Sequence, residues 1–191
     1  VTSKEFILLI NNLFLTITTF AILLGTLYPL ITSSLDLGKI SVGAPYFNFI
    51  FSALMLPVVF LMAPAVYSNW SKTNYNNLSR KLGKILFYAL VIAYVWMNFY
   101  YKSDIFVVYL GISLALFTII ASGIKIFQFF GSNLEKNYFK TILSIPSSTI
   151  ANSLAHIGIG VLIIGVTIST YYSSQKEIIM VKGSDILIQD T

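Results

Sequence analysis

His156 is the only histidine in the chain, and it lies well inside an apolar stretch at residues 149–172. A stretch of this length can cross a bilayer, because a spanning helix takes about 20 mostly apolar residues. At helical spacing, Asn152 lies one turn before the histidine and Gly160 one turn after it. An imidazole in hydrocarbon needs a partner, which can be a hydrogen-bonding neighbour, a proton path or a metal.

Small residues accompany this histidine in the sequence, namely Ala155, Gly158, Gly160 and Gly165. Small residues let another helix, or a flat ligand, come close to the backbone. A helix face with one histidine and several glycines suits an axial ligand to haem, since the porphyrin needs clearance around the iron–nitrogen bond. His156 is therefore a candidate ligand to haem iron, and Gly158 and Gly160 are candidates for haem or helix clearance.

Residue types alone leave three interpretations of His156 open. The side chain can hydrogen-bond to a neighbouring helix and hold a bundle together, it can ligate haem, or it can conduct protons or ions. No Asp, Glu or Arg lies in the middle of an apolar stretch, and carriers of ions usually need such charges. No residue is assigned a catalytic role.

The composition indicates an integral membrane protein. Of 191 residues, 57% are hydrophobic and only 10% are charged, and the mean hydropathy is +0.82, whereas soluble domains carry about 25% charged residues. The net charge of +5 comes mostly from short loops, so it indicates membrane topology and not nucleic-acid binding. The absence of cysteine excludes disulfides, thiolate metal sites and the attachment site of c-type haem.

The predicted fold class is an all-α integral membrane protein, a five-helix transmembrane bundle. The predicted spans are residues 6–30, 46–67, 85–101, 105–130 and 149–172. The connections at 68–84 and 131–146 are basic, which predicts that they lie on the cytoplasmic or matrix side. The N-terminus is then expected on that side and the C-terminus on the outer side.

Residues 173–191 differ in character from the transmembrane domain at residues 1–172. Two short apolar runs are separated by Gly183-Ser184-Asp185, a pattern that predicts two strands joined by a turn. An isolated hairpin is marginal in water, so we expect the start of a small extracytoplasmic β-domain. Because the first residue is Val1 and not Met, we expect a fragment of a longer chain or a non-standard start.

Several segments, in this order and spacing, resemble the CcmF haem lyase family, the large membrane subunit of the cytochrome c maturation apparatus. They are Asn11-Asn12, Leu24–Leu30, Leu37–Asn48, Ala155-His156-Ile157-Gly158, Gly165-Val166-Thr167 and Tyr172-Ser173. The resemblance extends over nearly the whole chain, and the segment Leu37–Asn48 is its longest and most specific part.

The resemblance implies a role in moving haem from the haem chaperone CcmE to apocytochrome c. It also implies a b-type haem within the membrane, for which the histidine of an Ala-His-x-Gly context, here His156, is one axial ligand. The implied partners are the remaining part of the haem lyase, CcmE, apocytochrome c with its thiol-reducing and chaperone subunit, membrane lipid and quinol. The implied location is a bacterial or mitochondrial inner membrane.

The chain also departs from the family pattern. The tryptophan-rich haem-handling motif is absent, since the only tryptophans are Trp70 and Trp96. The second membrane histidine is absent too, so the second axial ligand of haem b is not in this chain. We therefore expect a C-terminal portion or a split subunit of a haem lyase, inactive on its own. The alternatives are a membrane transporter or permease subunit and a structural scaffold subunit of a larger membrane complex.

Overall fold

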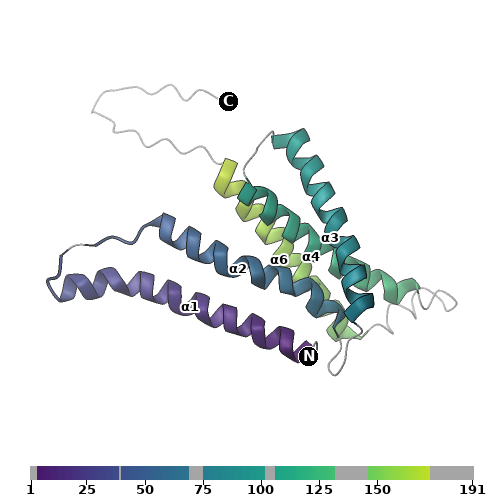
Figure 1. The fold of residues 1–191 in the computed structure, drawn as a ribbon, viewed down its shortest axis with the longest axis horizontal. Helices are drawn as coiled ribbons and strands as arrows, with labels where there is room; N and C mark the ends of the chain where they lie inside the picture. The colour runs from purple at the N-terminus through teal and green to yellow at the C-terminus, as the bar shows by residue number, and fades with distance from the viewer. Residues whose placement is uncertain (1–3, 39, 69–74, 102–105, 132–145, 173–191) are drawn as a thin grey trace.

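The chain folds into long α-helices that pack side by side (Figure 1). The structure, a computed structural model, describes residues 4–38, 40–68, 75–101, 106–131 and 146–172. The elements are α1 (Lys4–Ser34), α2 (Ala44–Tyr67), α3 (Tyr75–Trp96), the π-helical segment η1 (Met97–Tyr101), α4 (Phe106–Gly131) and α6 (Ser147–Tyr172). The described residues include no strand, and the β segment predicted at residues 173–191 lies outside them.

All five long helices are apolar and long enough to cross a membrane. This confirms that the described part of the chain is all-helical, with five helices that are long and apolar enough to span a membrane. The helix bounds lie close to the predicted spans, except that α3 begins at Tyr75, well before residue 85. The early turns of α3 contain Arg80 and Lys81, which favour helix and whose long side chains can reach water from an apolar surface.

The helix at the centre of the described bundle is α4. It packs against α2, α3 and α6, whereas α1 packs mainly against α2 (Figure 1). In the most apolar part of each helix, 44% of the residues of α4 are buried but only 6% of those of α1. Small residues along α4, such as Gly111, Ala115 and Ala121, let several neighbouring helices approach its backbone.

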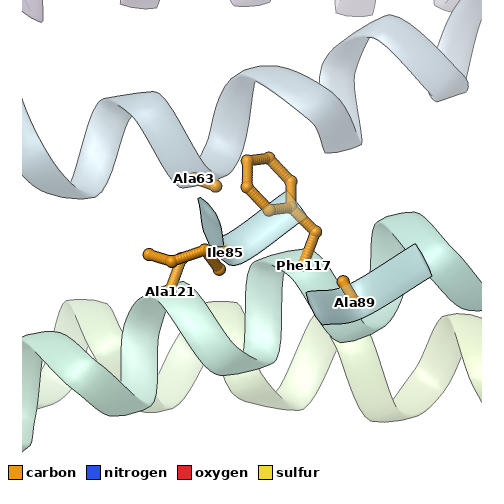
Figure 2. Close-up of a cluster of buried hydrophobic side chains, with 5 residues drawn as sticks. All are labelled: Ala63, Ile85, Ala89, Phe117 and Ala121. Carbon is orange, nitrogen blue, oxygen red and sulfur yellow. The ribbon is translucent and has the colours of Figure 1, made fainter. Parts of the chain in front are cut away.

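One buried cluster joins α2, α3 and α4 (Figure 2). Its members are Ala63, Ile85, Ala89, Phe117 and Ala121. The Phe117 ring also stacks on Phe60 of α2, with the ring centroids 5.9 Å apart. Lipid tails are as apolar as these side chains, so burial from water does not drive this contact. The fit of one large ring among alanines is what stabilises the packing of the three helices.

The contact between α1 and α2 depends on an aromatic ring that lies over a glycine. Near the start of α2, the Tyr46 hydroxyl donates a hydrogen bond to the carbonyl of Ala21, 3.0 Å away. The Tyr46 ring occupies the space in which a Cβ of Gly25 would lie, so no larger residue fits there. The chain reverses between the helices through Asp36 and Gly38, which both have positive φ, at 53° and 104°.

Candidate functional site

The helix α6, which carries His156, lies antiparallel to α4. Its first turn forms at Pro146, whose carbonyl accepts hydrogen bonds from the amides of Thr149 and Ile150 at 2.9 and 3.3 Å. Further along, Gly160 of α6 lies against Ala115 and Ile119 of α4, and Thr167 lies against Gly111. These contacts fix the register of the two helices.

The His156 ring is hydrogen-bonded within its own helix. Its Nδ1 lies 2.6 Å from the carbonyl oxygen of Asn152. A carbonyl oxygen only accepts, so Nδ1 carries the proton and donates it. In the neutral imidazole, Nε2 then holds a lone pair, which can bind a metal or accept a proton. The sequence placed Asn152 near His156, and the structure assigns the contact to its backbone and not to its amide side chain.

The His156 side chain is partly buried, and it follows the buried Ser153 of α6 by one turn. Gly160 follows one turn later on nearly the same side, in the interface between the helices. Histidines that bind metals commonly donate the other ring N–H to a carbonyl or carboxylate, which fixes the ring orientation. The contact of Nδ1 with Asn152 is of this kind.

The two glycines that the sequence grouped with His156 have different surroundings in the structure. A Cβ on Gly160 would lie 3.1 Å from the Ala115 carbonyl oxygen and would collide with the Ile119 side chain, so this glycine provides clearance between α4 and α6. Gly158 has nothing within 4 Å of the position of a Cβ. Two residues apart on a helix, Gly158 and His156 point in nearly opposite directions. The structure therefore brings Gly160, but not Gly158, to the side of His156.

Sequence reasoning missed two serines near this site. Ser153 on α6 and Ser122 on α4 are buried, and within the described part of the chain their hydroxyls have no hydrogen-bond partner. Ser153 precedes His156 by one turn. The antiparallel register that pairs Ile119 with Gly160 brings Ser122 to the level of the His156 turn. The sequence could have indicated Ser153, because it lies at helical spacing from the only histidine. It could not have indicated Ser122, because the proximity of Ser122 depends on how α4 is aligned with α6.

The donor chemistry of this site fits one axial position of a haem and no more. Nε2 of His156 is available as a nitrogen ligand, and the chain contains neither another histidine nor any cysteine. Among the described residues, no group of three or more His, Cys, Asp and Glu side chains could hold a metal ion. Five helices long and apolar enough to span a membrane, with one imidazole on the last of them, thus describe a multi-helix protein that can offer a single histidine ligand.

Comparison with known proteins is consistent with this class and makes it more specific. The chain is 34% identical over 188 residues to the cytochrome c-type biogenesis protein CcmF of Pseudomonas aeruginosa, covering 96% of this chain and 27% of that protein. It is 28% identical over 193 residues to CcmF of Escherichia coli, covering 98% and 28%. It is 29% identical over 175 residues to the cytochrome c-type biogenesis protein NrfE of Haemophilus influenzae, covering 91% and 26%.

The chain is homologous to one portion of the cytochrome c-type biogenesis proteins of the CcmF family. It spans about a quarter of the length of the curated relatives it matches. No family model matches the chain, and no solved structure matches it.

Proposed function

We propose that this chain is a membrane portion of a cytochrome c haem lyase and that His156 is an axial ligand of a b-type haem. The observation that carries the proposal is the hydrogen bond from Nδ1 of His156 to the Asn152 carbonyl, which leaves Nε2 as the free donor atom. The homology to CcmF proteins along 96% of the chain supports the same assignment.

In this proposal, each local feature of α6 has a definite task. The Asn152 carbonyl holds the Nδ1 proton and so keeps the imidazole in one tautomer and one orientation. The apolar residues of α6 exclude water from the ring, and Gly160 keeps α4 close behind it. When bound, the haem supplies one-electron redox chemistry, and its potential depends on axial ligation and on the polarity of its surroundings.

The proposed partners follow from the same assignment. They are the remaining part of the haem lyase, which supplies the second axial ligand, the haem chaperone CcmE, and apocytochrome c with its thiol-reducing and chaperone subunit. Quinol is the proposed source of electrons. The proposed location is a bacterial or mitochondrial inner membrane, with the basic connections 68–84 and 131–146 on the cytoplasmic or matrix side. The chain alone does not attach haem.

The test is a reduced-minus-oxidised absorption spectrum of the native complex that contains this chain. We expect a b-type signal in the wild type and its loss in His156→Ala at matched protein levels. Asn152→Ala is the matched control, because it removes the side chain but keeps the carbonyl that holds Nδ1, and it should leave the signal unchanged. Added imidazole should restore part of the signal in His156→Ala by replacing the missing ligand.

Two outcomes would overturn the ligand assignment. One is a b-type signal of equal size in the wild type and His156→Ala. The other is a complete complex without any haem signal, in which case His156 acts as a structural residue of a scaffold or permease subunit. A signal that is lost in His156→Ala and not restored by imidazole, together with reduced assembly of the complex, also favours the structural role.

A further inference from the structure

Two lysines from different helices face the same aromatic ring at one end of the bundle. The Nζ atom of Lys81, on α3, lies 3.9 Å from the centroid of the Tyr67 ring, and Nζ of Lys125, on α4, lies 5.3 Å from it. The Tyr67 hydroxyl donates to the carbonyl of Ala121, 2.7 Å away, which fixes the ring between α2 and α4. Lys81 also donates to Oε1 of Gln128, at 3.0 Å.

The described contacts of these lysines are all with neutral groups, an aromatic ring and an amide. The described residues include only two carboxylates, Glu5 and Asp36, which belong to α1 and the turn after it. Asp36 lies in the turn at the opposite end of α2 from Tyr67, whereas Glu5 lies in the first turn of α1, at the Tyr67 end of the antiparallel α1–α2 pair. The contacts given above for the two lysines include neither carboxylate. Two ammonium groups beside one ring repel each other and attract an anion.

This group of residues lies at the membrane boundary. Tyr67 is the last residue of the span Ala44–Tyr67, and Gln128 is the last residue of the span Phe106–Gln128. Lys81 lies in the first turns of the span Asn76–Phe99. The ends of spans are where lipid headgroups lie, and basic sites between transmembrane helices commonly bind anionic headgroups.

We propose that Lys81 and Lys125 bind a phosphate group, that of an anionic phospholipid, beside the Tyr67 ring. Each ammonium group has three N–H donors, and Lys81 uses one of them on Gln128, so donors remain for phosphate oxygens. Free phosphate has the same oxygens, but a site at the end of apolar spans favours a headgroup with acyl chains. This inference goes beyond the proposed function and does not depend on any role of His156.

The experiment uses the native complex that contains this chain, in detergent, with lipid binding measured by native mass spectrometry. Phosphatidylglycerol is the anionic probe and phosphatidylcholine the zwitterionic one. We expect the wild type to prefer phosphatidylglycerol and Lys81→Gln/Lys125→Gln to bind it on the order of tenfold more weakly. The matched control is Arg80→Gln/Lys84→Gln, which removes the same charge from exposed positions of α3 and should retain binding within about twofold.

Two further experiments distinguish a lipid headgroup from free phosphate and test whether the glutamine variant loses binding only because it misfolds. Inorganic phosphate at millimolar concentration should leave phosphatidylglycerol bound, and displacement of the lipid would assign the site to free phosphate and overturn the lipid. Lys81→Arg/Lys125→Arg keeps both charges and should keep binding. Equal affinity for the two lipids in the wild type, which needs no variant, would overturn the proposal. So would equal loss of binding in the control and in the glutamine variant.

Discussion

The hydrogen bond between His156 Nδ1 and the Asn152 carbonyl determines which nitrogen of the ring is available to a ligand. The sequence could single out His156 as a candidate ligand, because a lone histidine in an apolar stretch stands out by composition. It could not identify the tautomer, because that depends on which acceptor the ring reaches. The same limit applies to Gly158 and Gly160, which the sequence grouped together and which the packing of α4 distinguishes.

The two glycines give a matched pair of variants at the residue scale. Gly160→Ala should destabilise the packing of α4 on α6 by about 1–3 kcal/mol, because its methyl group would collide with Ile119 and crowd the Ala115 carbonyl. Gly158→Ala should not destabilise the chain and should stabilise it by up to about 1 kcal/mol, since nothing lies within 4 Å of the added methyl group and alanine favours helix over glycine. Thermal unfolding in detergent, followed by size-exclusion chromatography, measures both. Equal destabilisation by the two variants would contradict the packing described here.

At the scale of elements, the sequence predicted the five long helices because each combines length with apolar composition. The predicted span began at residue 85, after the start of α3 at Tyr75, because the prediction followed hydropathy and left out the basic residues that precede the apolar stretch. The helix itself extends further towards the N-terminus, because Arg80 and Lys81 are good helix formers. The packing of Tyr46 over Gly25 was not predictable, because it depends on how the turn at Asp36 and Gly38 sets α2 against α1.

The pair of α1 and α2 can be tested through that packing. Gly25→Val should separate the helices, because the Tyr46 ring occupies the space that the new side chain needs. Tyr46→Phe keeps the ring and removes only its hydrogen bond to Ala21, so it should lower stability by about 1 kcal/mol. Gly83→Val is the control, since Gly83 on α3 has nothing within 4 Å of a Cβ. Limited proteolysis in the turn around Gly38 measures the separation, and we expect faster cleavage in Gly25→Val than in Gly83→Val. Equal cleavage of all variants would contradict the prediction.

At the scale of the whole molecule, the arrangement of helices around α4 was beyond sequence reasoning. Every span is apolar on most of its surface, so hydropathy does not say which faces meet. The meeting faces are set by small residues and by large rings that fit between them, as Phe117 does among Ala63, Ala89 and Ala121 (Figure 2). The relatives that the chain matches are about three and a half times as long as the chain.

The orientation in the membrane gives a prediction for the whole molecule. Basic connections predict that the start of α6 lies on the inner side and the turn after α1 on the outer side. The chain has no cysteine, so Asp36→Cys and Ser147→Cys each introduce a unique thiol. A membrane-impermeant maleimide should label Asp36→Cys in intact spheroplasts and Ser147→Cys only after permeabilisation. The reverse pattern would invert the topology, and labelling of both in intact spheroplasts would exclude five spans.

The central position of α4 has a consequence for the order of assembly during synthesis. Helices enter the membrane in chain order and associate afterwards through packing. The helices α1 and α2 contact each other directly and can pair as soon as both are inserted. By contrast, α3 has few contacts with α2 and packs mainly on α4, so it has to wait for a helix that is synthesised after it. In a nascent chain whose synthesis is stopped before α4, α1 and α2 should therefore be paired and α3 should have no packing partner.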